Sequence, residues 1–183
     1  MIKLTTVAST QELEQILELQ QCNLQQNIDE TEMQTQGFVT MIHNIDVLQQ
    51  MHNLAPSVVA KDGDKVIGYA LVMLRECREL FPPLEPMFKN FDRLEYRYRP
   101  LNEYRFYVMG QVCIDKQYRR TGLFDQLYQK HKEVYGSQFD FIMTEVSTRN
   151  LRSLRAHERV GFETLNTYHD ELDEWSVVLW NWQ

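Results

Sequence analysis

Residues 117–131 read QYRRTGLFDQLYQKH, and this stretch decides the fold prediction. It opens with Arg119, Arg120, Thr121 and Gly122 and continues with apolar residues at helical spacing. The first N–H groups of a helix have no intrahelical partner, and the helix dipole adds positive potential there. Two arginines, a hydroxyl and a glycine at this point predict a site for an anion, and a phosphorylated ligand is the simplest candidate.

An alternative interpretation of this loop needs no ligand, because Arg119 and Arg120 can lie on a solvated helix start where Gly122 only serves the turn. The chain has a formal net charge of -7 and a pI of about 5.2, which argues against a nucleic-acid partner. It contains no GxxxxGK[ST] and no GxGxxG pattern, which argues against a P-loop nucleotidase and a dinucleotide fold.

Patterns on both sides of the loop alternate between strand and helix. Downstream, residues 139–146 predict a strand, residues 150–160 a helix and residues 174–180 a further strand. Upstream, residues 104–114 predict a strand with two distinct faces. One face is expected to carry Tyr104, Phe106, Val108, Val112 and Ile114, and the other Arg105, Tyr107, Gln111 and Cys113.

The first hundred residues add two helices and a hairpin. Residues 8–24 and 44–54 have helical periodicity, and residues 57–74 predict a β-hairpin that turns at Asp62-Gly63. Residues 76–103 are rich in proline and aromatic residues and are predicted to form an insertion or lid. The order of elements indicates one α/β (α+β) domain built on a mixed sheet.

Composition restricts the class of protein further. Hydrophobic residues make up 43% and charged residues 25% of the chain, which is typical of a soluble domain. Three dispersed cysteines (Cys22, Cys77 and Cys113) and widely spaced histidines predict no disulfide framework, no metal site and a reducing, cytoplasmic location. The longest apolar run, YALVML, is too short to span a bilayer, so no membrane partner is expected.

Two segments resemble the GNAT superfamily of acyl-CoA-dependent N-acyltransferases. The first, VCIDKQYRRTGLF (112–124), is similar to the family's [QR]-x-x-G-x-[GA] loop, and the pattern falls on Arg119, Arg120, Thr121, Gly122, Leu123 and Phe124. Phe124 departs from the glycine or alanine of the family. The second, EVSTRNLRSLRAHERVGF (145–162), places Asn150, Ser153 and His157 on the family's asparagine, small and tyrosine positions.

This resemblance implies a single GNAT-like domain over residues 1–183, with a mixed, mostly antiparallel sheet of about six or seven strands flanked by helices. It implies acetyl-CoA as co-substrate, with the loop amides around its pyrophosphate and Val112, Cys113 and Ile114 beside its pantetheine arm. Asn150 and Ser153 join these cofactor-binding residues. Cys113 itself is interpreted as an inert buried thiol, because no His–Asp partner is identifiable.

Glu145 and His157 are the candidate catalytic residues. Glu145 shares a strand face with Phe139, Phe141 and Met143, and desolvation there would raise its pKa toward that of a general base. It also matches the base glutamate of the ribosomal-protein alanine acetyltransferases, whereas the alternative is a surface glutamate or a partner of Arg149 or Arg152. The resemblance implies that His157 acts as general acid or only contacts the coenzyme.

The leading hypothesis is an enzyme that transfers an acetyl group from acetyl-CoA directly to a primary amine of a small molecule or peptide. A non-catalytic acyl-CoA-binding regulatory module and a protein-interaction domain using residues 81–107 are the alternatives. A homodimer is compatible with all three hypotheses. The sequence does not identify the acceptor amine.

Residues 81–99 are expected to form a partly helical lid beside the thioester. Phe88, Phe91 and Tyr96 share one helical face, so at least one of them is predicted to line the acceptor pocket, with Tyr107 as a further candidate.

Overall fold

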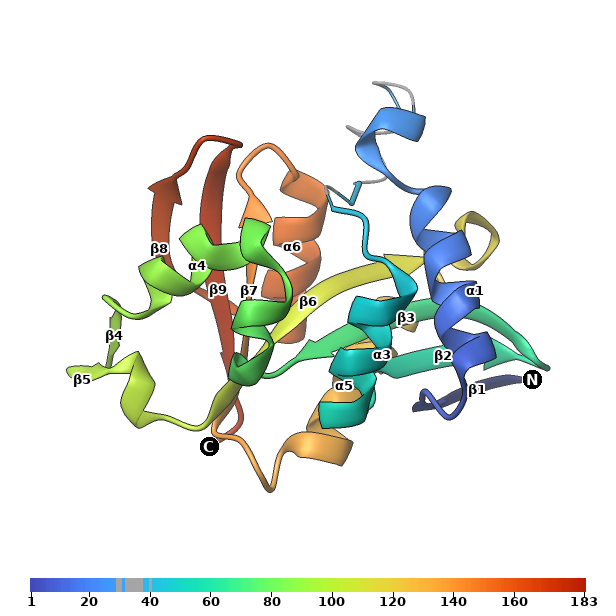
Figure 1. Ribbon diagram of the computed structural model, residues 1–183, viewed down its shortest axis with the longest axis horizontal. Coiled ribbons are helices and arrows are strands. Elements are labelled where there is room, and N and C mark those ends of the chain that lie inside the picture. Colours follow the sequence, from blue (N-terminus) through green and yellow to red (C-terminus); the bar gives the residue numbers. More distant parts are fainter. Residues whose placement is uncertain (29–30, 32–37, 40) are drawn as a thin grey trace.

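A mixed sheet organises the protein (Figure 1), whose computed structural model describes residues 1–28, 31, 38–39 and 41–183. Within these residues the main sheet has seven strands in the order β1-β2-β3-β6-β7-β9-β8. All neighbours are antiparallel except β6 and β7, which run parallel. The predicted α+β class and sheet are therefore confirmed. The strands are β1 (Ile2–Thr6), β2 (Val58–Asp62), β3 (Lys65–Met73), β6 (Phe106–Ile114), β7 (Phe141–Ser147), β8 (Glu163–His169) and β9 (Glu174–Asn181).

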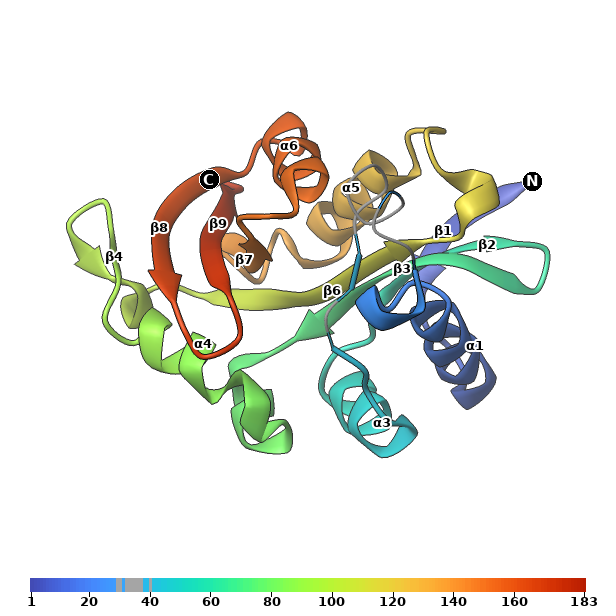
Figure 2. The same ribbon diagram turned by 90° about the horizontal axis from the view of Figure 1, so that it is seen from above.

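Helices cover both faces of the sheet (Figure 2). One face packs against α1 (Thr10–Gln21), α3 (Ile45–Leu54) and α4 (Glu85–Phe91), and the other against α5 (Leu123–Tyr135) and α6 (Leu151–Val160). Each face buries its own apolar cluster, and this burial is the main stabilising contribution to such a fold. No helix in the described ranges combines the length and the apolar content that crossing a membrane requires.

The β2–β3 hairpin is confirmed, but its turn lies one residue later than predicted. Asp62 pairs with Lys65, so Gly63 and Asp64 form the two-residue loop. Gly63 has φ +60, whereas Asp64 does not adopt positive φ. A glycine in the first loop position is the requirement of a type II′ turn.

The predicted strict alternation along β6 is wrong beyond Gly110, because the strand contains a β-bulge. Val72 of β3 pairs with Met109, but Ala70 pairs with Val112, so three steps along β6 oppose two along β3. The extra residue moves Val112 and Ile114 to the face that carries Tyr107 and Met109, and it moves Cys113 to the face of Phe106 and Val108. Bulges of this kind re-aim strands beside functional sites.

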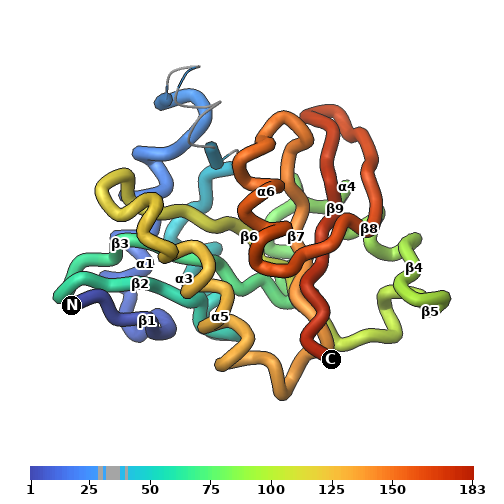
Figure 3. Tube along the Cα trace, turned by 180° about the vertical axis from the view of Figure 1, so that it is seen from behind, coloured from blue at the N-terminus to red at the C-terminus, as the bar shows by residue number. Residues whose placement is uncertain are grey.

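The segment between β3 and β6 is partly helical, as predicted. Besides α4 it contains a separate small hairpin of β4 (Glu95–Tyr96) and β5 (Arg99–Pro100), which projects from the body (Figures 1 and 3). Arg78 bonds both Glu85 and Asp92 and holds α4 against the preceding turn. Short 3₁₀ turns cover Gln25–Asn27, Arg75–Leu80, Pro82–Leu84, Leu101–Glu103 and Lys116–Tyr118.

Candidate active site

The site begins where β6 and β7 separate. The two strands pair only over Phe106–Val108 and Phe141–Met143. Beyond this point β6 continues along β3 and β7 continues along β9. The Thr144 hydroxyl donates to the Met109 carbonyl (2.8 Å) at the base of the fork. The β7-facing edge of β6 past Met109 has no strand partner in the described chain, and the Ile114 carbonyl near its end accepts from Arg119 Nε (3.3 Å).

A cleft of about 840 Å³ occupies one side of this fork. Its walls come from the end of β6, the loop before α5, and α6. All the predicted cofactor-binding residues except Thr121 line it, namely Val112, Cys113, Ile114, Arg119, Arg120, Gly122, Leu123, Phe124, Asn150 and Ser153. The Thr121 hydroxyl instead donates to the Tyr118 carbonyl (2.6 Å) and closes the loop.

The loop before α5 has the backbone of an anion site. Arg120 (φ +65) and Gly122 (φ +80) both adopt the left-handed conformation, and Gly122 caps the thirteen-residue helix α5. Left-handed residues in such a loop turn successive N–H groups toward a common point, where the helix dipole adds positive potential. The Phe124 ring packs on Tyr128 (5.0 Å between centroids) and His157 (5.1 Å). The residue that departs from the expected loop pattern is therefore part of the adjoining aromatic cluster.

Five arginines gather around this cleft in a chain of net charge -7: Arg119, Arg120, Arg152, Arg155 and Arg159. Burial and the positive charges of Arg119, Arg120 and Arg159 lower the pKa of Arg152. Grouped positive charges repel one another, and a bound anion offsets that repulsion. The three α6 arginines were missed in the sequence, although their spacing of i, i+3 and i+7 places them on one helix face.

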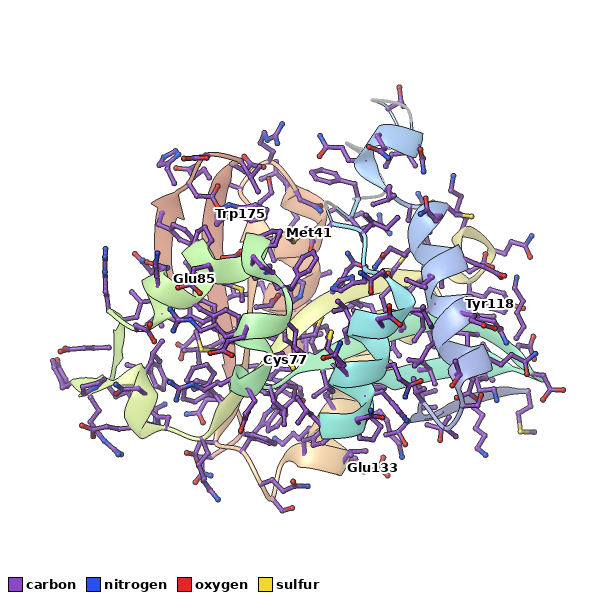
Figure 4. The ribbon with its side chains drawn as sticks, viewed as in Figure 1. Met41, Cys77, Glu85, Tyr118, Glu133 and Trp175 are labelled. Atoms are coloured by element: carbon purple, nitrogen blue, oxygen red, sulfur yellow. The ribbon has the colours of Figure 1, made fainter. Side chains whose placement is uncertain are left out.

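Two smaller cavities continue from the cleft. A cavity of about 90 Å³ shares Val112, Asn150 and Ser153 with the cleft. It shares Glu145 and Trp175 with a third cavity of about 210 Å³, which we call the acceptor cavity. The arginine cleft, Glu145 and the acceptor cavity therefore adjoin one another in series, and we call this series the path through the fork. Figure 4 labels Met41 and Trp175 on this path.

Glu145 is the titratable group at the centre of the path. Burial raises its pKa to about 7, against the opposing effect of a hydrogen bond from the Tyr168 hydroxyl to Oε2 (2.6 Å). The alternative partner Arg149 pairs with Asp173 instead (2.7 Å). Tyr168 was missed because it lies on β8, two strands away from Glu145, and no local pattern links the two.

Of the apolar row expected beside Glu145, Phe141 and Met143 do lie in the core of the α1 face. Phe139 precedes β7 and packs on Tyr107 in the opposite core instead (4.9 Å between centroids). Its predicted place in the row is therefore wrong.

His157 is 1% exposed, and both of its ring nitrogens are engaged. Nδ1 lies 2.8 Å from the Ser153 carbonyl and therefore carries the hydrogen, so Nε2 accepts from the Tyr128 hydroxyl (2.6 Å). Burial lowers the pKa of His157 to about 4, and the ring is neutral at pH 7. This arrangement argues against the general-acid role. Burial also raises the pKa of Cys113 to about 12, consistent with an inert thiol.

The aromatic residues expected to line the acceptor cavity do not reach it. The lid segment contributes Pro83, Leu84 and Met87 to the cavity wall. Phe88 and Phe91 line a separate cavity of about 400 Å³ instead, although α4 buries them on the same side as Met87. Tyr96 bonds Glu163 (2.7 Å), and Tyr107 is buried against His131 (2.7 Å between hydroxyl and Nδ1).

A sequence profile described as the Acetyltransferase (GNAT) family matches residues 13–162. Since this match spans most of the chain, the protein belongs to the GNAT acetyltransferase family, whose members are acetyl-CoA-dependent acyltransferases. Comparison with curated proteins by sequence gives no match.

Solved structures share the fold at low sequence identity. A subunit of the NatC complex bound to Gag peptide and CoA is 15% identical with a TM-score of 0.65, and 98% of each chain is covered. The Escherichia coli ribosomal-protein-S18-alanine N-acetyltransferase is 11% identical with a TM-score of 0.64, covering 99% of this chain and 94% of that one. A spermidine N-acetyltransferase chimera from Vibrio cholerae is 14% identical with a TM-score of 0.60, covering 99% and 95%.

Proposed function

We propose that the protein is an N-acetyltransferase that transfers the acetyl group of acetyl-CoA directly to a primary amine of a small molecule or peptide. The observation that carries this proposal is the series of adjoining cavities in which Glu145 lies between the arginine cleft and the acceptor cavity. The amides at the start of α5 and the arginines would hold the pyrophosphate. The free edge of β6 would bond the pantetheine arm, which places the thioester in the fork.

Glu145 would act as the general base. A carboxylate with a pKa of about 7 is half ionised at neutral pH and suits proton transfer from a substrate ammonium. As the amine nitrogen bonds to the thioester carbonyl carbon, the C–S bond breaks, the thiolate leaves with the bonding electron pair, and the nitrogen loses its second proton to water. A simple thiol has a pKa near 8.5, so the thiolate can take its proton from water and needs no acid from His157.

Thiol release and calorimetry together test this proposal. Coenzyme A should bind with a measurable heat, and acetyl-CoA should release thiol only when an accepted amine is present. Binding without thiol release across alkyl, aryl, polyamine and peptide amines would make the protein a non-catalytic acyl-CoA-binding module instead. No binding of coenzyme A would remove both assignments.

Tyr168 should set the pH range in which Glu145 works. Its hydroxyl lowers the pKa of Glu145 by donating to Oε2, so Tyr168→Phe should raise that pKa. Activity requires the ionised base, and the rising limb of the pH profile of kcat should therefore move to higher pH. Tyr104→Phe, which removes a hydroxyl bonded to the Tyr96 carbonyl (2.9 Å) outside the cleft and the acceptor cavity, is the matched control. A profile of Tyr168→Phe that coincides with that of the unmodified protein would contradict the pairing.

A further inference from the structure

The acceptor cavity has an unusual wall. Among the described residues that line it are Met41, Met73, Met87 and Met109, half of the eight methionines in the chain. They come from four separate segments: the stretch before α3, the end of β3, α4 and β6. Val108, Leu84 and Trp175 extend the same apolar surface. Methionine side chains are unbranched and polarizable and adapt to apolar groups of differing shape.

Two aspartates of the cavity already have hydrogen-bond partners. Asp173 is bonded to Arg149 (2.7 Å) and to the Ser147 hydroxyl (2.7 Å). Asp170 accepts the backbone N–H groups of Leu172 (2.8 Å) and Asp173 (2.9 Å) at Oδ1 and so closes the β8–β9 turn, while its Oδ2 has no donor among the described residues.

Glu145 is the third carboxylate of the cavity. Tyr168 bonds its Oε2, and Oε1 has no donor among the described residues. The charge of Asp170 helps to raise the pKa of Glu145, so the two carboxylates lie near each other in the cavity, beside its apolar wall.

We infer that the acceptor is a primary monoamine whose amine-bearing carbon carries an apolar group. This inference rests on the proposed function and names its acceptor class. The ammonium would lie at Glu145 and its apolar group among the methionines, where burial removes apolar surface from water. A second ammonium or a distal carboxylate would be buried in the same wall without a partner, which is costly. An alkylamine, an arylalkylamine and the α-amine of a peptide with an apolar first residue share this chemistry.

A matched pair of acceptors tests the inference. n-Pentylamine and cadaverine have the same carbon chain and differ by one distal amine. We expect kcat/KM for n-pentylamine to exceed that for cadaverine by at least about tenfold, because the distal ammonium loses its hydration in the cavity. A tripeptide beginning with Leu, compared with one beginning with Asp, should show the same order. Comparing kcat/KM for n-pentylamine with kcat/KM for the Leu tripeptide then shows whether the acceptor is a small amine or a peptide.

Met87 provides the matching change in the protein. It is 3% exposed and lines the acceptor cavity but not the arginine cleft. Met87→Glu should raise kcat/KM for cadaverine relative to n-pentylamine by about tenfold or more, since it supplies the missing counter-charge. Met87→Leu, the control, should keep the preference for the monoamine. A rise in melting temperature with coenzyme A shows that each variant folds.

Equal or faster acetylation of cadaverine by the unmodified protein would overturn the inference and leave the proposed function intact. If no amine is acetylated, the proposed function fails, and the inference is decided by binding alone. In that case n-pentylamine should raise the melting temperature of the CoA-loaded protein more than cadaverine does. If n-pentylamine raises the melting temperature by the same amount as cadaverine or by less, the inference is overturned even for a protein that only binds amines.

Discussion

Glu145→Gln should lower the turnover number with any accepted amine by roughly 10²–10⁴-fold, the range that general acid–base catalysis contributes. The amide cannot take the proton of the ammonium, whereas its size and its contact with Tyr168 stay similar. Coenzyme A binding should change little, because Glu145 does not line the arginine cleft. Glu133→Gln on the exposed side of α5 is the matched control and should alter neither quantity (Figure 4).

The same variant should be more stable than the unmodified protein above neutral pH. Burial raises the pKa of Glu145 from 4.5 to about 7, so the folded state binds the extra proton and its stability falls as the pH rises through that window. Glutamine removes this cost, and the melting temperature of Glu145→Gln should be higher at about pH 8, with the gain vanishing toward about pH 4. A folded variant with unchanged turnover would remove Glu145 from the mechanism.

Gly122→Val should abolish most of the stabilisation that coenzyme A gives. At 100 times its dissociation constant a ligand adds about 2.7 kcal/mol to the free energy of unfolding, which is a readily measured shift in melting temperature. Gly122 has φ +80, a conformation that a β-branched residue rarely adopts, so valine should distort the amides that face the phosphates. A Cβ there would approach nothing closer than Gln126 (3.8 Å), so crowding is not the cause.

Gly63→Val separates this effect from backbone strain. Gly63 has φ +60, a Cβ there meets nothing within 4 Å, and it lies in the β2–β3 turn outside the cleft. Both variants should lose stability without ligand, but only Gly122→Val should lose the response to coenzyme A. An equal response in the two variants would show that the loop before α5 does not bind the coenzyme.

The parts of the site that local patterns determine were predictable from the sequence. The loop of Arg119 and Gly122 was identified because a glycine and arginines follow a strand and precede a helix, and such a junction has unpaired N–H groups. Glu145 was identified because a carboxylate in an apolar row must be desolvated or must end the row. Asn150 was placed at a helix start, and in the structure it caps α6 by accepting from the Ser153 N–H (3.2 Å).

The parts that depend on how distant segments meet were not predictable. Tyr168 reaches Glu145 across an intervening strand, and Tyr128 reaches His157 from another helix. The bulge in β6 changes which face each following residue occupies, and one inserted residue leaves no mark in an alternating apolar pattern. Of the lid aromatics predicted to share one helix face, Phe88 and Phe91 do lie on α4, but Tyr96 lies on β4, so the prediction is wrong for Tyr96. Phe88 and Phe91 pack in the core rather than at the cavity, and periodicity does not distinguish the two.

One measurement tests the central claim most directly: mass spectrometry of the amine and the protein after reaction with acetyl-CoA and n-pentylamine, alongside an assay of the released thiol. Direct transfer predicts one N-acetylated amine for each thiol released, protein of unchanged mass, and no product from Glu145→Gln on the same time scale. Thiol release with no acetylated amine, or acetyl groups that remain on the protein, would contradict the account.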